Sequence, residues 1–162
     1  MVAIVPGRVT HDLDGDAVVF LIGIRINRLR AVRAWLPALR AMGPMLRELS
    51  ADRGLGLLGY TAHASARGAL VVQYWRDLDS LIGYAQAGGR AHRPAWTDFN
   101  RRARAAGGAV GIWHETYTVP AGRHESLYVD MPAAGLPAAV GAVPATGPRQ
   151  TARGRLGQQA TG

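Results

Sequence analysis

Apolar residues follow two periods along this chain, and the first clear segment is a strand predicted over residues 17–26. The run AVVFLIGIRI is rich in β-branched and apolar residues, as expected of a strand buried on both faces. A period of two puts five side chains on one face: Val18, Phe20, Ile22, Ile24 and Ile26. The other face carries Val19, Leu21, Gly23, Arg25 and Asn27.

Helical periodicity begins after Arg28. Apolar residues recur at intervals of three and four, at Val32, Trp35, Leu36, Leu39 and Met42. Pro37 lies inside this pattern, so the helix either begins near it or kinks there. Gly43-Pro44 predicts the end of this helix and the start of a second one, because glycine suits the end of a helix and proline its first turn. The second helix is expected to end near Arg53-Gly54.

Two further strands are predicted over residues 55–64 and 69–75, and the short link between them predicts an antiparallel hairpin. Asp77 is a suitable N-cap for a helix that ends at Gly88-Gly89. Pro94 then starts another short helix. A last strand is predicted over residues 109–119, with Ile112, His114 and Thr116 on the same face.

This order of elements predicts an α+β fold of the ferredoxin-like βαββαβ type, with helices on one face of a four-stranded antiparallel sheet. We expect residues 17–131 to form the domain, residues 1–16 a lead with a possible strand at 2–5, and residues 125–131 a short edge strand. Residues 132–162 are rich in Ala, Gly, Pro and Arg, which predicts a disordered tail. The uncovered sheet face is apolar, which favours a homodimer that pairs two sheets.

Composition narrows the function classes. The chain has 162 residues, enough for one domain, and it contains no cysteine, which excludes disulfides and thiolate chemistry. All 19 basic residues are arginine and the formal charge is +8, but the arginines are scattered or lie in the tail, so we expect no nucleic-acid partner. The chain start lacks a signal-peptide pattern and no apolar run could cross a bilayer, so a cytoplasmic protein without a membrane partner is expected.

Candidate chemistry gathers between residues 73 and 100. His92, Trp75 and Trp96 surround a predicted strand end and helical elbow, an arrangement that could form a small pocket with one titratable or ligating group. A structural interpretation stays open, because tryptophans at this spacing often anchor a core and a single histidine is often structural. No zinc motif, phosphate loop, nucleophile elbow or paired carboxylate is present, which argues against hydrolases and kinases.

Several segments resemble a bacterial family of monooxygenase-like proteins of unassigned function in the dimeric α+β barrel superfamily. They include FLIGIRINRLRAVRAWLPALRAMGPMLREL, VQYWRDLDSLIGYA, RAHRPAWTDFNRR and GIWHETYTVPAG, within residues 17–131. Relatives in that superfamily are antibiotic-biosynthesis monooxygenases, haem-degrading monooxygenases and aldoxime dehydratases. The resemblance implies a homodimer with one pocket per subunit between sheet and helices.

The same resemblance implies catalytic roles for His92, Asn27 and Trp75, with His92 as proton shuttle or, if haem is bound, as the iron ligand. The expected substrate-binding residues are Trp96, Arg25, Phe99, Tyr74 and His114. The implied activity is a monooxygenase that acts on a hydrophobic, aromatic small molecule, with either no cofactor or haem and no other metal. The alternatives are a haem-binding lyase similar to aldoxime dehydratase and a non-catalytic dimer that binds small molecules.

Overall fold

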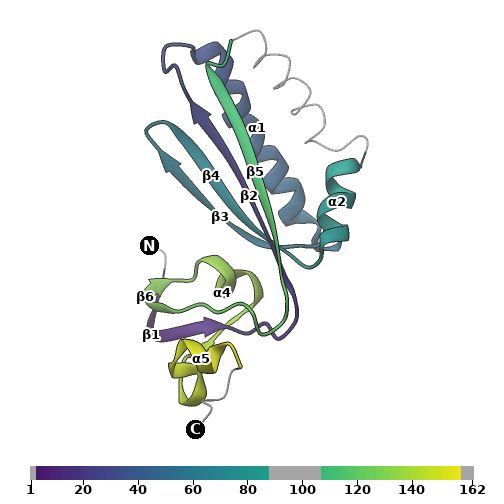
Figure 1. Ribbon diagram of the computed structural model, residues 1–162. Helices are drawn as coiled ribbons and strands as arrows, with labels where there is room; N and C mark the ends of the chain where they lie inside the picture. The colour runs from purple at the N-terminus through teal and green to yellow at the C-terminus, as the bar shows by residue number, and fades with distance from the viewer. Residues whose placement is uncertain (1–2, 88–106, 158–162) are drawn as a thin grey trace.

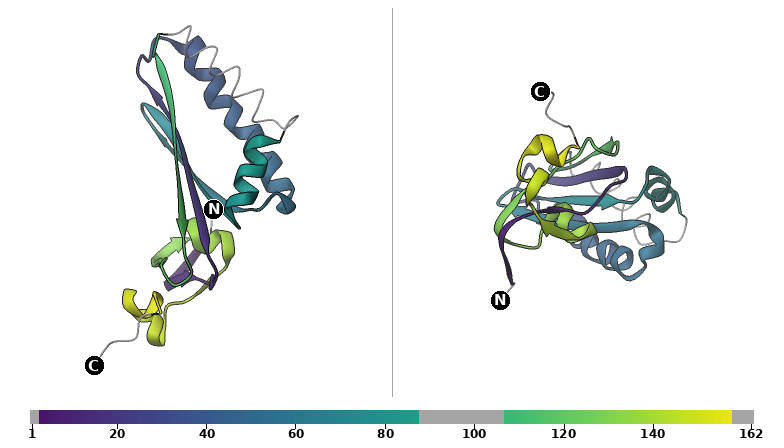
Figure 2. Two further views of the ribbon diagram at one scale, coloured as in Figure 1. Left: turned by 45° about the vertical axis from the view of Figure 1, so that its right-hand side comes forward. Right: turned by 90° about the horizontal axis from the view of Figure 1, so that it is seen from below.

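The computed structural model describes residues 3–87 and 107–157 and is built around one four-stranded antiparallel sheet (Figure 1). Its strands lie in the order β3 (Leu57–Ser65), β4 (Gly68–Trp75), β2 (Ala17–Ile26) and β5 (Val110–Val119). Figure 2 shows both α1 (Val32–Ala51) and α2 (Leu78–Gln86) on the same face of this sheet. The ferredoxin-like βαββαβ prediction is therefore confirmed.

The strand bounds follow the sequence pattern closely. Strand β2 has the predicted limits, and β3 pairs with β4 through a two-residue turn after Ser65. Strand β3 begins two residues later than predicted because Arg53–Leu55 form a 3-10 turn, η1. Gly56 then adopts a left-handed conformation with φ 90°, which glycine tolerates without a steric penalty.

Helix α1 is one continuous helix of 20 residues, so the prediction of two helices separated at Gly43-Pro44 is wrong. Pro44 cannot donate to the preceding turn, a loss that costs about 3 kcal/mol in a helix interior. Packing explains why the helix continues, because the apolar stripe runs past Pro44 to the buried side chains of Leu46 and Leu49. Gly43 is not left-handed, so the expected helix end does not form.

A second sheet lies at the end of the molecule where β2 begins (Figure 1). It has three strands in the order β6 (Tyr128–Pro132), β1 (Ile4–His11) and β7 (Ala142–Pro144), with β1 antiparallel to both neighbours. The strand expected at residues 125–131 thus belongs to this sheet rather than to the edge of the main one. Strand β1 is also longer than the segment 2–5 suggested, because it pairs on both sides.

The prediction of disorder after residue 131 is wrong as far as residue 157. This segment forms α4 (Gly135–Val140), β7, the 3-10 turn η2 (Gly147–Gln150) and α5 (Ala152–Arg155). Although the segment has few apolar side chains, those of Leu136 and Ala145 are buried and contribute to packing. Backbone pairing of β7 with β1 adds hydrogen bonds that composition does not reveal.

The sheet face opposite α1 and α2 is only partly covered. Helix α4 packs on β3 there, with the backbone N–H of Gly135 donating to Thr61 Oγ1 at 3.2 Å. Farther along this face, the side chains of Trp113 and Tyr117 on β5 remain 42% and 51% exposed. None of the helices in residues 3–87 and 107–157 combines the length and apolar character that crossing a bilayer requires.

Candidate ligand cavity

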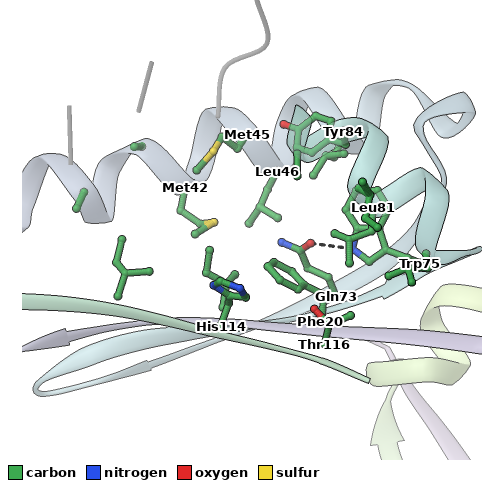
Figure 3. Close-up of a pocket in the computed structure, with 18 residues that line it drawn as sticks. Phe20, Met42, Met45, Leu46, Gln73, Trp75, Leu81, Tyr84, His114 and Thr116 are labelled. Atoms are coloured by element: carbon green, nitrogen blue, oxygen red, sulfur yellow. Dashed lines mark hydrogen bonds between the residues drawn. The ribbon is translucent and has the colours of Figure 1, made fainter. Parts of the chain in front are cut away.

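A cavity of about 490 Å³ lies between the main sheet and the two helices that cover it (Figure 3). Its size is within the range of small-molecule sites, which are concave and mostly apolar. The strand residues that line it are Phe20, Ile22, Gln73, Trp75, Ile112, His114 and Thr116. The confirmed alternation of β2 and β5 places these side chains on the helix-facing side.

The helices supply an almost wholly apolar wall. The lining residues from α1 are Ala38, Ala41, Met42, Met45, Leu46 and Leu49. Those from α2 are Leu78, Leu81, Ile82, Tyr84 and Ala85. Within the described part of the lining, no Asp, Glu, Arg or Lys side chain is present. Such a wall favours a neutral, hydrophobic ligand, because an unpaired charge would be costly to bury.

Trp75 forms the closed end of the cavity. Its side chain is 1% exposed and belongs to the core cluster of Val18, Leu49, Leu57, Trp75, Leu81 and Tyr84. The indole Nε1 donates to Oε1 of Gln73 at 2.9 Å, and the ring lies 5.9 Å from that of Tyr84. Trp75 is thus a wall residue of the cavity and an anchor of the core, and its catalytic role stays a prediction.

His114 provides the imidazole of the described lining. It lies on β5, the edge strand, with its ring centroid 5.7 Å from that of Phe20. The side chain is exposed, as is that of Thr116, so this side of the cavity is open to solvent. Figure 3 shows the imidazole facing the cavity, across from the helices. A neutral imidazole there can accept or return a proton of a bound molecule.

Asp77 fixes the start of α2 and thereby one wall of the cavity. One carboxylate oxygen accepts from the backbone N–H of Ser80 at 2.6 Å, which confirms the predicted N-cap. The other oxygen accepts from Nε of Arg76 at 2.9 Å. These hydrogen bonds, those from Ser80 first, lower the pKa of Asp77 to about 2, so the cap is charged at neutral pH.

Two of the predicted site residues, Arg25 on β2 and Asn27 just after it, lie away from the cavity. The amide Nδ2 of Asn27 donates to the carbonyl of Gly108 at 2.9 Å, and its backbone N–H donates to that of Ala109. Asn27 therefore ties the end of β2 to the start of β5. Arg25 is exposed and belongs to the opposite sheet face, because its parity differs from that of Phe20. Both expectations that these residues line the pocket are corrected.

Tyr74 also faces away from the cavity, since it neighbours Gln73 and Trp75 on a strand. It lies under α4, where a Cβ on Gly135 would come 3.4 Å from the Tyr74 hydroxyl. Burial, and then the nearby Tyr128, raise the pKa of Tyr74. Tyr74 thus packs against α4. It does not occupy the substrate-binding position that the sequence predicted. The predicted residues His92, Trp96 and Phe99 lie outside the described residues.

Gln73 is a cavity residue that the sequence interpretation missed. It is 5% exposed, and it occupies a helix-facing position in the middle of β4. A signal was available, because Gln73 and Trp75 are two residues apart and so share a face. An amide on the apolar face of a central strand requires a partner, and Trp75 provides it.

Haem was one of the two cofactor options, and its expected ligand His92 is not among the described residues. The described lining offers the His114 imidazole and the thioethers of Met42 and Met45, all groups that can ligate haem iron. It offers no arginine or lysine to pair with the carboxylates of a porphyrin. This part of the lining does not fit haem, and we derive no step through that group.

Comparison with known proteins finds a matching protein family and a related monooxygenase. The family model described as monooxygenase af470-like matches residues 17–136. Monooxygenase af470 of Aspergillus fumigatus is 30% identical over 140 residues, which cover 78% of this chain and 48% of that relative. The chain thus spans about half the length of this curated relative.

One solved structure of low sequence identity shares the fold, and a second is similar over a smaller part of this chain. The structure of aldoxime dehydratase OxdRE in complex with butyraldoxime matches with a TM-score of 0.63 and 17% identity, over 83% of this chain and 40% of that chain. SnoaB, a cofactor-independent oxygenase from Streptomyces nogalater, matches with a TM-score of 0.41 and 14% identity, over 64% and 93%. Because the family model covers most of its length, the chain belongs to the monooxygenase af470-like family.

Proposed function

We propose that this protein is a monooxygenase-type enzyme that oxidises a neutral, hydrophobic, aromatic small molecule in the cavity between sheet and helices. The observation that carries the proposal is the cavity itself, about 490 Å³ in volume, with an apolar wall and very few polar side chains. Membership of the monooxygenase af470-like family supports an oxygenase rather than a hydrolase. The aromatic side chains of Phe20 and Trp75 in the lining support an aromatic substrate.

A phenol is the simplest substrate of this class, and its reaction balances with dioxygen alone. One oxygen atom enters the ring to give a quinone, and the other leaves as water with two hydrogens of the substrate. The protein must remove the phenol proton, because the phenolate is the electron-rich form that oxygen attacks. His114 is positioned to accept that proton at the open side of the cavity. His92 remains a predicted proton shuttle.

Oxygen consumption with 1-naphthol tests the proposal, with 1-methoxynaphthalene as the matched compound that has no proton to lose. We expect oxygen uptake and formation of 1,4-naphthoquinone from the naphthol and none from the ether. His114→Ala should lower kcat by about 10²-fold or more, the usual contribution of a general base. His63→Ala is the control, because His63 is exposed and is not part of the cavity lining.

The absorption spectrum of the purified protein separates the cofactor options. Without a Soret band, a cofactor-independent oxygenase is supported; with one that His92→Ala abolishes, the haem-binding lyase alternative is favoured. Binding of 1-naphthol without oxygen uptake or product would favour the non-catalytic binder and contradict the proposal.

We also propose that two copies pair through the sheet face opposite the helices. Trp113 and Tyr117 are large aromatic side chains that stay half exposed there, next to Leu21 and Val72 on neighbouring strands. Helix α4 covers only the β3 side of this face. A second copy is the occupant we propose, because a two-fold interface would bring the exposed aromatic side chains of both copies together.

Molar mass in solution tests the pairing. Tyr117→Glu should shift the protein toward monomer, because it places a charge beside Glu115 in the contact. Tyr60→Glu is the matched control, since Tyr60 is similarly exposed but lies on the other face of the sheet. A wild-type monomer at high micromolar concentration, measured by light scattering, would contradict this part of the proposal.

A further inference from the structure

The amide of Gln73 is a buried polar group in an apolar environment. It is 5% exposed and sits on β4 in register with Phe20 on β2 and Tyr60 on β3. An amide removed from water without hydrogen-bond partners is energetically unfavourable. Each end of this amide therefore needs a hydrogen-bond partner, and the two ends differ in what they require.

Trp75 determines which way the amide points. The indole nitrogen is only a donor, so the atom it meets at 2.9 Å must be the Gln73 oxygen, Oε1. Turning the amide over would place its NH₂ group against the indole N–H and leave both unpaired. The indole cannot move away, because Trp75 is 1% exposed in the core. The hydrogen bond from the Trp75 indole thus fixes the orientation of the amide.

The locked orientation leaves Nε2 as a donor with two hydrogens directed at the cavity. Figure 3 shows the nitrogen on the side of the amide away from Trp75, toward the space below α1. Among the side chains and backbone groups of residues 3–87 and 107–157, no hydrogen bond from this nitrogen is formed. The neighbouring lining residues, Phe20, Leu46 and Met42, offer no oxygen acceptor.

We infer that Gln73 is the specificity-determining donor of the cavity and that its ligands carry a hydrogen-bond acceptor oxygen, such as a ketone or quinone oxygen, on an otherwise apolar skeleton. This inference rests on the proposed function only in taking the cavity as the ligand site. The acceptor enters toward the Trp75 end, while the apolar body contacts the methionines and leucines of α1. A hydrocarbon of the same shape leaves the Gln73 donor unpaired and binds more weakly.

Gln73 and His114 lie two strands apart, on either side of β2. Adjacent strands are about 4.8 Å apart, and His114 lies two residues along β5 from Thr116, the residue level with Gln73, so the two polar residues are about 12 Å apart. A ligand anchored by its oxygen at Gln73 therefore extends over Phe20 toward His114 at the open side. A phenol group at the far end of such a skeleton, rather than the anchored oxygen, is then the group that lies near the imidazole.

A matched pair of probes tests the donor directly: 2-acetylnaphthalene, which has a carbonyl, and 2-isopropenylnaphthalene, which has a CH₂ group in its place. Dissociation constants follow from quenching of tryptophan fluorescence. We expect the full-length protein to bind the ketone at least about tenfold more tightly, the value of one buried hydrogen bond. Equal affinity for the two probes, or binding of neither, would overturn the inference.

Gln73→Glu is the decisive variant, because its carboxylate keeps an oxygen for the Trp75 N–H and has no donor once ionised. The ketone preference should disappear by pH 9.5, since a buried carboxyl group can stay protonated and still donate near neutral pH. Tyr60→Phe, on the same rung of the sheet but outside the cavity, is the control and should keep the full preference. A preference retained in Gln73→Glu at every pH would contradict the inference.

Trp75→Phe provides a second route if Gln73→Glu does not fold. It removes the indole N–H and frees the amide to turn, so the ketone preference should fall several-fold while the cavity stays apolar. Persistence of the full preference in Trp75→Phe would show that the indole does not orient the donor. Probe discrimination without oxygen uptake would refute the monooxygenase and leave the donor in place, whereas uptake without discrimination would refute the donor alone.

Discussion

The indole of Trp113 lies directly over Gly23 on the adjacent strand. The two residues are paired in register between β2 and β5, on the sheet face opposite the cavity. A Cβ added to Gly23 would come within 2.4 Å of the indole Cε2 and Nε1 atoms, so the ring occupies the space that a side chain would take. An aromatic ring that covers a strand glycine in this way shields the backbone and presents a flat apolar surface.

Gly23→Ala should therefore displace the indole and destabilise the protein. We expect a loss of about 1–3 kcal/mol in the free energy of unfolding, the usual cost of overfilling a packed position. Gly111→Ala is the matched control, because a Cβ at this β5 glycine meets nothing within 4 Å. Urea unfolding at one fixed protein concentration measures both, and similar losses for the two variants would contradict the packing argument.

Asp77 caps the helix that forms one wall of the cavity, so its removal should loosen that wall. Asp77→Ala is expected to cost about 1 kcal/mol, typical of a lost N-cap, whereas Asp77→Asn keeps a capping oxygen and should cost less. Asp79→Ala, in the same turn, is the control because Asp79 does not accept from the helix backbone in the described structure. Thermal unfolding distinguishes these variants.

The pH dependence of the cap has a definite sign. The folded-state pKa of Asp77 is lowered from 3.8 to about 2, so its contribution is full above pH 3.8 and is lost as the pH falls toward 2. The Asp77 side chain is 45% exposed, so this contribution is screened by solvent and we expect it to be small. A steep loss of stability between pH 7 and 5 cannot originate from Asp77.

His11 and His124 form a chain of hydrogen bonds that joins β1 to the segment before β6. Nε2 of His124 lies 2.8 Å from the carbonyl of Gly15, which can only accept, so this nitrogen carries the hydrogen. In the neutral pair, Nε2 of His11 then donates to Nδ1 of His124 at 2.9 Å, and Nδ1 of His11 accepts from Ser126 Oγ at 2.8 Å. Double protonation would break the central bond.

This arrangement predicts a loss of stability on mild acidification. Burial, and then the positive charge that His124 can carry, lower the folded-state pKa of His11 below 6.5. Glu125 and Asp12 oppose this shift, whereas Arg149 adds to it. The unfolded chain therefore binds the proton more readily, and stability contributed by neutral His11 is present above pH 6.5 and lost as the pH falls below it. One titrating proton can change the free energy of unfolding by at most about 1.4 kcal/mol per pH unit.

His11→Gln should show a flatter stability profile than the wild type between pH 7.5 and 5.5, measured by urea unfolding. His63→Gln, at an exposed position on β3, is the control and should keep the wild-type slope. Parallel profiles for the wild type and His11→Gln would show that the imidazole pair does not determine the acid response.

Arg155 stabilises the C-terminal segment through a largely buried ion pair. Its side chain is 6% exposed; Nε donates to Glu125 at 2.7 Å, and Nη1 donates to the carbonyls of Arg149 and Gln150. Arg155→Met should leave Glu125 without this partner and cost about 2–3 kcal/mol, somewhat below a fully buried pair because Glu125 is partly exposed.

Cleavage by thermolysin reports on this segment separately from the rest of the chain. Residues 145–157 should be cut faster in Arg155→Met than in the wild type, at a concentration where the main sheet stays intact. Arg153→Met removes the same charge from an exposed position two residues away and should leave the rate unchanged. Equal rates in the two variants would refute the role of the ion pair.

Local periodicity was sufficient to predict the main sheet. Alternation along residues 17–26 and 109–119 assigned Phe20, Ile22, Ile112 and His114 to particular faces, and these side chains do share the cavity. The hairpin after Ser65 and the cap at Asp77 are equally local, since each depends on a few consecutive residues. Face assignment also separates Arg25 and Tyr74 from the cavity once the helix-facing side is known.

Other features depended on contacts between distant segments. Helix α1 continues through Pro44 because its stripe packs on the sheet, and residues 132–157 are ordered because β7 pairs with β1 and Arg155 meets Glu125. The direction of the Gln73 amide likewise depends on a buried indole. The sequence by itself determined which residues repeat with a strand or helix period, because that pattern is local. Only the tertiary structure decided which polar groups are paired in the interior, because burial makes each such group depend on partners from other elements.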